Sequence, residues 1–331
     1  MQIRDIPLVL TSELCSGRVY IVVGANVGLG YEAAKHLVSL GSARVIMACR
    51  NVTAGQSALA TIEAETGKAG IAEVWELDLS SYASVKAFSS RAVSSLSRID
   101  AVIENAAVAS TSDMRAEGHP LPVTVNVTGT FLLAVLLLPK LKVDAARLEI
   151  QPHIAIVTSG VGFEAKEQWL KVADDPIAKL DKLEIQSEFL YGTSKLFEIL
   201  AVRHLAPLIP VSKTGVVINL INPGLCKTEL ARNATPEFRD RLSQMHAQYG
   251  RTAEQGSRTL LHGAIAGEAS HGCYLDACEI NEYVLTSLFF GLKVPDWVDD
   301  EEGRKMQKWA WEAVAHELEA VEPGCVARIL E

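Results

Sequence analysis

The chain lacks any long run of apolar residues. Its longest run, residues 131–138, is far shorter than the about 20 residues that a membrane-spanning helix requires. Residues 1–16 are mixed in polarity and contain only a short apolar stretch at 8–10, so they do not resemble a secretion signal. We therefore expect a cytoplasmic protein that has no membrane partner.

Basic residues and paired cysteines are also scarce. The chain has 31 Lys and Arg against 40 Asp and Glu, a net charge of −9, whereas binding to nucleic-acid phosphates needs clustered Lys and Arg. This balance excludes a nucleic-acid partner. The six cysteines are scattered and suggest no disulfide framework. His271, Cys273 and Cys278 lie close together but lack the paired spacing of a zinc site, so we expect no metal.

What the chain does have is a regular alternation of short apolar runs and helical patterns. The run 19–23 is almost wholly apolar, as expected of a strand buried on both faces of a sheet. The alternation indicates βαβ units, and hence an α/β fold: a doubly wound parallel sheet of the Rossmann type in a single domain, 1–331. The expected strands are 18–23, 44–48, 71–77, 99–103, 153–158 and 215–220, and the expected helices are 29–40, 53–65, 81–97, 124–141 and 188–208.

Two polar, charged segments interrupt the alternation, at 160–187 and 225–250. Both follow predicted strands, and ligands of open α/β sheets bind beyond the carboxyl ends of the strands. We therefore interpret both segments as substrate-side insertions. A third segment, 299–321, places apolar residues among many Glu and Lys and predicts an amphipathic helix at the carboxyl end of the chain.

A glycine-rich turn separates the first expected strand from the first expected helix. Gly24, Gly28 and Gly30 allow a tight turn whose backbone N–H groups can approach a pyrophosphate at the amino end of the helix. The second strand ends in Arg50, with no Asp or Glu nearby to bind a ribose 2′-hydroxyl. Because a guanidinium pairs well with a 2′-phosphate, the pattern favours NADP(H) over NAD(H).

A second constellation lies further along the chain. Tyr191 and Lys195 are spaced i, i+4 near the start of a helix, so the phenol and the ammonium share one face, and a nearby positive charge would lower the pKa of the phenol. Ser159, after the fifth strand, would face the same crevice. Asn126, between two valines of the long helix, is either a site residue or a structural cap.

Taken in order, these motifs resemble those of the short-chain dehydrogenase/reductase family, and most closely those of its retinol-dehydrogenase-like and fungal specialised-metabolism branches. The resemblance covers residues 18 to about 290. It departs from the usual pattern at Val23, where the family has Thr, and at Glu104 and Ala107, where the family has Asn and Gly. The missing glycine at position 107 could push this loop outward. The resemblance is carried by Gly24, Gly28, Gly30, Asp78, Asn105, Ala106, Ala107, Asn126, Ser159, Tyr191, Lys195, Pro223 and Gly224.

The resemblance implies a role for each matched residue. Tyr191 is the general acid/base, Ser159 positions the substrate oxygen, and Asn126 keeps a water in a proton relay. Lys195 lowers the pKa of the tyrosine and holds the nicotinamide ribose. The implied cofactor contacts are Gly24, Asn26, Val27, Gly28, Leu29, Gly30, Arg50, Asp78, Leu79, Asn105, Ala106, Ala107, Tyr191, Lys195, Pro223, Gly224 and Thr228.

The expected function is an NADPH-dependent reduction of a ketone or aldehyde on a small molecule. Alcohol oxidation or redox epimerisation by the same site, and a non-catalytic NADP(H)-binding sensor or scaffold, stay open as alternatives, as does a homodimer. Apolar residues of the two insertions indicate a fairly large apolar or aromatic substrate, such as a polyketide or terpenoid intermediate; packing of the insertions against the domain is the other explanation. These residues are Phe163, Trp169, Leu190, Leu225, Leu230, Met245 and Tyr249.

Overall fold

A computed structural model describes residues 5–110, 113–232, 234–281 and 293–331 of the chain. Its centre is an eight-stranded sheet in the order β3-β2-β1-β4-β7-β8-β9-β10, in which every neighbouring pair is parallel except β9 and β10. The strands of this sheet are β1 (Val19–Val23), β2 (Arg44–Cys49), β3 (Ala72–Glu76), β4 (Ala101–Glu104), β7 (His153–Val157), β8 (Val217–Asn222), β9 (Tyr274–Asp276) and β10 (Glu279–Ile280).

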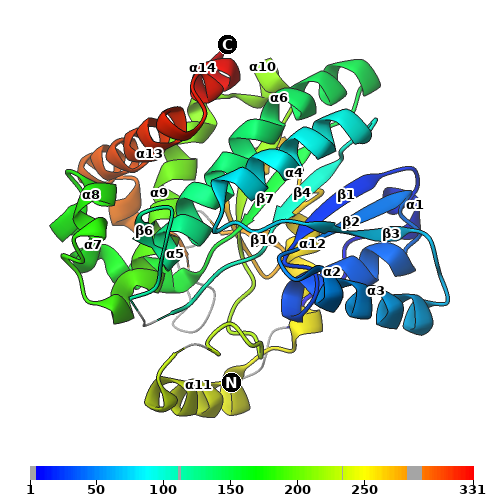
Figure 1. Cartoon of the computed structure of the whole chain (residues 1–331), viewed down its shortest axis with the longest axis horizontal. Coiled ribbons are helices and arrows are strands. Elements are labelled where there is room, and N and C mark those ends of the chain that lie inside the picture. Colours follow the sequence, from blue (N-terminus) through cyan, green and yellow to red (C-terminus); the bar gives the residue numbers. More distant parts are fainter. Residues whose placement is uncertain (1–4, 111–112, 233, 282–292) are drawn as a thin grey trace.

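Helices cover both faces of this sheet (Figure 1). One face is covered by α2 (Gly28–Ser39), α3 (Val52–Thr66) and α12 (Ala253–Gly263). The other is covered by α4 (Tyr82–Ser95), α6 (Thr130–Leu148) and α9 (Leu190–Leu208), with α13 (Glu301–Val321) packed outside α9. Short elements complete the chain: α1 (Ser12–Cys15), α10 (Val211–Thr214), η4 (Glu268–Ser270), η5 (Asp296–Val298) and α14 (Cys325–Leu330).

The central strands are buried on both faces because their side chains alternate between two apolar cores. In β1, Ile21 and Val23 enter the core that contains α4, α6 and α9, whereas Tyr20 and Val22 enter the core that contains α2, α3 and α12. All four are at most 1 % exposed. The doubly wound α/β fold is thereby confirmed, and the strand order reverses between β1 and β4, where open α/β sheets bind their ligands.

The helix expected at 124–141 is longer and less regular than the sequence indicated. It consists of α5 (Leu121–Val123), a π-helical turn η1 (Thr124–Gly129) and α6. By length and composition alone, the helix 121–148 could cross a membrane, but 89 % of its apolar 18-residue stretch is buried inside the protein. Its apolar residues therefore pack in the core that α4, α6 and α9 form against this face of the sheet.

The two segments that interrupt the alternation follow β7 and β8. Residues 160–187 contain η2 (Gly160–Ala165), α7 (Lys166–Val172) and α8 (Pro176–Asp181), followed by η3 (Ser187–Phe189) before α9. Residues 225–250 contain α11 (Pro236–Tyr249), which extends away from the body of the molecule in Figure 1. A parallel bridge between Cys226 and Arg251 closes the base of this second segment.

A hairpin that the sequence did not predict, β5 (Arg115–Ala116) and β6 (His119–Pro120), joins distant parts of the chain. The His119 ring contacts Asp181 of α8 through Nδ1 at 2.9 Å and Glu317 of α13 through Nε2 at 3.1 Å. Its pKa is raised, first by the hydrogen bond with Glu317, and the pKa of Glu317 is lowered by the same contact. The His119 imidazole thus links the segment after β7 to the carboxyl-terminal helix, and both contacts favour its protonated form.

We expect His119→Gln to destabilise the protein mainly at mildly acidic pH. Because the pKa of His119 is raised by folding, its contribution is fully present below the ordinary histidine value of about 6.5 and is lost as the pH rises through the folded value. The contribution of Glu317 is lost instead as the pH falls through its lowered pKa. The loss in free energy of unfolding should reach about 1–3 kcal/mol between these limits.

Urea unfolding at several pH values measures this difference between parent and variant. His204→Gln is the matched control, because burial lowers the pKa of His204. Its removal should improve stability at acidic pH rather than reduce it. A loss for His119→Gln that does not shrink with rising pH would contradict the proposed charge.

Candidate functional site

The glycine-rich turn has the backbone that a phosphate cradle needs. Gly24 and Gly28 have φ values of 74° and 63°, which are favourable only for glycine. A Cβ on Gly30 would lie 2.4 Å from the Gly24 carbonyl oxygen, so this position cannot carry a side chain. Val27 precedes α2 without a side-chain cap, so the first N–H groups of the helix are not capped by that side chain.

Loops after two other strands border the same turn. After β4, the Asn105 amide donates hydrogen bonds to the carbonyl oxygens of Val23 at 3.0 Å and Gly24 at 3.4 Å. The Ala106 side chain lies against Gly24 as well. Residues 105 and 106 of the loop are therefore held against the turn. After β8, the Thr228 methyl group lies 3.5 Å from where a Cβ on Gly28 would be.

The turn Pro223-Gly224 is fixed by an arginine that the sequence did not reveal. Arg251 donates a hydrogen bond from a guanidinium nitrogen to the Pro223 carbonyl oxygen at 2.8 Å and lies 3.7 Å from the Asp276 carboxylate. A Cβ on Gly224, which has φ 78°, would lie 2.3 Å from the same guanidinium. No local pattern could have indicated this contact, because it joins residues 28 positions apart.

Arg50 and Asp78 occupy the ends of β2 and β3, on the α3 side of the turn. Arg50 is exposed and forms no ion pair with any other residue that the structure describes, so its guanidinium is available to an anion. The Asp78 carboxylate accepts hydrogen bonds from the Ser80 N–H at 2.9 Å and hydroxyl at 2.6 Å. Leu79 is buried, and its carbonyl oxygen lies where a Cβ on Gly129 would be.

Tyr191 and Ser159 meet beyond the carboxyl end of β7. Ser159 caps η2, and Tyr191 is the second residue of α9. A side-chain hydrogen bond between them opposes the rise in the pKa of Tyr191 that burial produces. The two hydroxyl groups thus lie at the same edge of the sheet, and their roles in a site stay predictions.

Asn126 is completely buried in the π-helical turn. Its side chain accepts a hydrogen bond from the Val108 N–H at 2.8 Å and donates to the Val108 carbonyl oxygen at 3.0 Å and the Ser194 hydroxyl at 2.9 Å. It therefore joins the loop after β4 to α9, three residues beyond Tyr191. Of the two roles left open by the sequence, these contacts support the structural one directly; a role in a proton relay is untested.

Lys195 makes contacts that differ from those expected. Its Nζ donates to the Val157 carbonyl oxygen at 2.9 Å and the Glu198 carboxylate at 2.7 Å, and lies 6.0 Å from the centre of the Tyr191 ring. The pKa of Tyr191 is raised rather than lowered, first by burial and then by the negative charge of Glu198. Burial, the largest of these causes, outweighs the lowering that was expected from Lys195.

Other predicted residues separate into two groups. Phe163, Trp169 and Leu190 are at most 8 % exposed and belong to the core, where Trp169 packs on Phe197 with ring centres 5.0 Å apart. For these three, packing of the insertion is the correct explanation. Met245 and Tyr249 are 43 % and 39 % exposed on α11. Within the described ranges no group of His, Cys, Asp and Glu could hold a metal.

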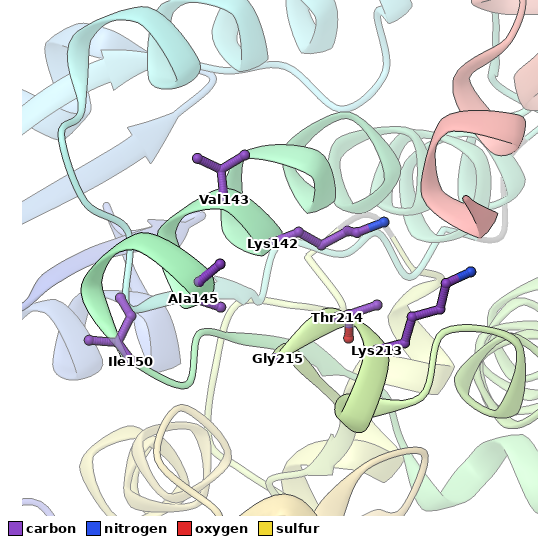
Figure 2. Close-up of a pocket in the computed structure, with 8 residues that line it drawn as sticks. Lys142, Val143, Ala145, Ile150, Lys213, Thr214 and Gly215 are labelled. Carbon is purple, nitrogen blue, oxygen red and sulfur yellow. The ribbon is translucent and has the colours of Figure 1, made fainter.

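A surface pocket lies at the opposite end of the sheet (Figure 2). It is bordered by the last turns of α6 and by α10, and Ile150 and Gly215 of its lining precede β7 and β8. It contains none of the predicted site residues. Its lining consists of Lys142, Val143, Ala145, Ala146, Ile150, Lys213, Thr214 and Gly215.

Comparison with known proteins establishes the family. Residues 18–171 match the model of the short chain dehydrogenases. The chain is 39 % identical over 314 residues to the short chain dehydrogenase/reductase dmxR8 of Cryptosporiopsis sp., a match that covers 93 % of each protein. The chain belongs to the short-chain dehydrogenase/reductase family. Another member, the short-chain dehydrogenase anuD of Penicillium roqueforti, is 35 % identical over 314 residues, covering 93 % of this chain and 79 % of that protein.

A solved structure supports the fold of this family member. The Pseudomonas aeruginosa RhlG/NADP active-site complex superposes with a TM-score of 0.59 at 22 % identity. The match covers 78 % of this chain and 94 % of that one. At this identity the likeness extends to the fold alone.

Arg50→Ala should reduce the preference of the protein for NADPH over NADH. Loss of one charge-assisted contact to a 2′-phosphate costs about 1.5–3 kcal/mol, or about one to two decades in Kd, and leaves NADH binding unchanged. Fluorescence titration with both dinucleotides measures the two constants. Arg304→Ala, an exposed arginine on α13, is the control and should alter neither. Equal affinity of the unmodified protein for both dinucleotides would exclude the role of Arg50.

Proposed function

We propose that this family member is an NADPH-dependent carbonyl reductase that acts on a ketone or aldehyde of a fairly large apolar or aromatic molecule. The observation that carries the proposal is the placement of Ser159, which caps η2 directly after β7, and of Tyr191, the second residue of α9, at one edge of the sheet. The glycine-rich turn lies beyond β1 at the same edge of the sheet. A proton donor and a dinucleotide cradle together are what carbonyl reduction requires.

Three features support NADP(H) as the cofactor. The turn needs glycine at Gly24 and Gly28 because of their positive φ values, and at Gly30 because a Cβ there would meet the Gly24 carbonyl oxygen. Arg50 is exposed beside this turn and is free to pair with a 2′-phosphate. RhlG, which shares the fold, is an NADP complex. When bound, the reduced nicotinamide supplies the hydride; Lys195, Pro223, Gly224 and Thr228 are the residues that would hold this half of the molecule.

The protein supplies the proton and the orientation of the substrate. The Ser159 hydroxyl donates a hydrogen bond to the substrate carbonyl oxygen, and Tyr191 donates the proton that this oxygen takes up. Burial and Glu198 raise the pKa of Tyr191, so the phenol is protonated at neutral pH. A protonated phenol suits reduction, whereas the alternative, alcohol oxidation, needs a phenolate.

The preference for an apolar substrate rests on the segment 225–250. Leu225 and Leu230 are half-buried beside Thr228, and Met245 and Tyr249 are exposed on α11. A polyketide or terpenoid intermediate has the size and polarity that such side chains bind. All six cysteines are free thiols, which supports a place in the reducing cytoplasm.

Tyr191→Phe tests the proton donor. The variant keeps the ring and removes only the hydroxyl group, so folding and NADPH binding should be retained while turnover falls by about 10²–10⁴-fold. NADPH consumption with a panel of aromatic ketones measures the rate, and Tyr31→Phe on α2 is the control. A variant that keeps more than about a tenth of the parent rate would exclude Tyr191 as the donor. A parent without turnover on any carbonyl compound would favour a sensor or scaffold.

Lys195→Met should weaken NADPH binding more than it changes the ionisation of Tyr191. Burial raises the pKa of Glu198 to about 7 even beside Lys195, so without the ammonium Glu198 takes up a proton and the net charge near the phenol changes little. Loss of its hydrogen bond to a ribose should raise the Kd for NADPH by about one to two decades. Cofactor titrations at several pH values, with pH–rate profiles at saturating NADPH, separate the two effects. A strongly shifted profile with unchanged Kd would show that Lys195 acts through its charge.

A further inference from the structure

Three buried polar side chains form a connected network behind the turn Pro223-Gly224. Arg251, Asp276 and Asn222 are 9 %, 3 % and 5 % exposed. The Arg251 Nη1 atom donates a hydrogen bond to the Pro223 carbonyl oxygen at 2.8 Å and lies 3.7 Å from Asp276 Oδ1. The same Asp276 oxygen accepts a hydrogen bond from Asn222 Nδ2 at 3.2 Å. The turn is therefore held by side chains from the end of β8, the end of β9 and residue 251.

Asn222 extends this network to the turn that follows β7. Its side-chain oxygen accepts a hydrogen bond from the Gly224 N–H at 3.2 Å and another from the Gly160 N–H at 3.4 Å. Gly160 directly follows Ser159, the residue expected to orient the substrate. Asn222 and Asp276 are paired in register at the ends of β8 and β9, so adjacent strands hold both side chains. One amide group thus joins the turn after β8 to the turn that carries Ser159.

The charge of Arg251 needs a reason beyond packing. Burying a guanidinium is unfavourable unless an anion and hydrogen-bond acceptors replace its water. Asp276 and the Pro223 carbonyl oxygen supply these partners. The fit also depends on Gly224, because a Cβ there would lie 2.3 Å from Nη1 and 2.9 Å from the central carbon of the guanidinium. The guanidinium therefore occupies the space that a side chain at position 224 would need.

The backbone of residue 251 has a separate role. Its N–H donates to the Leu225 carbonyl oxygen at 2.8 Å, and its carbonyl oxygen accepts from the Lys227 N–H at 2.9 Å, which closes the base of the segment 225–250. Any residue at position 251 can form these two bonds. A change of the Arg251 side chain therefore leaves the closure of the segment in place and acts on the turn Pro223-Gly224.

We propose that Arg251 is a positioning residue, which keeps the turn Pro223-Gly224 in the conformation that the nicotinamide half of NADPH requires. Asp276 holds the guanidinium from the other side, and Asn222 fixes the turn relative to Ser159. The inference rests on the proposed function, in which this turn binds the cofactor. Because hydride transfer requires a defined relative position of nicotinamide and carbonyl, the network controls both cofactor affinity and the alignment of the two reactants.

Amide hydrogen exchange in the cofactor-free protein, followed by NMR, tests whether the network holds the turn. Arg251→Met should speed exchange of the Gly224 N–H by about tenfold or more, because the turn loses its contact with the guanidinium. Asn222→Ala should speed exchange of both Gly224 and Gly160, since both amides bond to its side-chain oxygen. Arg258→Met is the matched control, because Arg258 also contacts a carboxylate and a backbone carbonyl but lies on α12. Parent-like exchange of Gly224 in Arg251→Met would overturn the positioning role.

Fluorescence titration with NADPH tests the consequence for the cofactor. Arg251→Met should raise the Kd by about tenfold. Arg251→Lys should raise it by only about threefold, because the ammonium keeps the charge but not the planar shape of the guanidinium. Arg258→Met should leave the Kd unchanged, even where its thermal stability falls as much as that of Arg251→Met. An unchanged Kd in Arg251→Met, or an equal rise in both methionine variants, would overturn the proposal.

A double-mutant cycle tests whether Asp276 acts through Arg251. Asp276→Asn should raise the Kd for NADPH, because the guanidinium loses its anion while the hydrogen bond from Asn222 is kept. In the Arg251→Met background the same change should have little further effect. Increases in Kd that multiply in full would show that the two residues act separately, and would reject the role assigned to Asp276.

The outcomes also separate this inference from the proposed function. None of these measurements needs a carbonyl substrate, so all of them stand if no such compound is reduced. A protein that reduces ketones, but binds NADPH equally well after Arg251→Met, would contradict the positioning role alone. A parent that does not bind NADPH would refute both. If Arg251→Met does not fold, Arg251→Lys decides: parent-like Kd and Gly224 exchange in that variant would overturn the proposal.

Discussion

Burial of the central strands on both faces restricts where this protein can place polar chemistry. Side chains within β1 must be apolar, because each one enters one of the two cores. Polar groups can act only where the strands end, and the order reversal between β1 and β4 opens the sheet there. The glycine-rich turn, Asn105 and the Tyr191–Ser159 pair all lie at the carboxyl ends of strands for this reason.

Glu104 departs from this arrangement because it carries an acid, with no hydrogen-bond partner on either oxygen, into the end of a buried strand. Its neighbours in the sheet are Val23 and Ile156, which offer it no side-chain hydrogen bond. Such a residue is tolerated only in its neutral form or beside a cation.

Local patterns in the sequence were sufficient for the features that are local. The alternation of apolar runs predicted the six longer strands to within a few residues, and the glycine spacing predicted the turn. The strands β9 and β10 were missed because three and two residues are too short for a periodic pattern. The His119 contacts and the Arg251 clamp were missed because their partners are distant in sequence. Glu198 could have been singled out from the sequence, because it is an acid within an apolar helical stretch three residues after Lys195.

The bridge between Cys226 and Arg251 makes the segment around α11 an independent unit of variation. Both ends of the segment are held together by backbone hydrogen bonds, from Lys227 to Arg251 at 2.9 Å and from Arg251 to Leu225 at 2.8 Å. Closing a longer loop costs only about 0.6 kcal/mol for each doubling of its length. Relatives could therefore exchange or lengthen this segment without moving Pro223 or the glycine-rich turn. The part of the segment beyond Thr228 can therefore change in length while the base of the segment keeps its position.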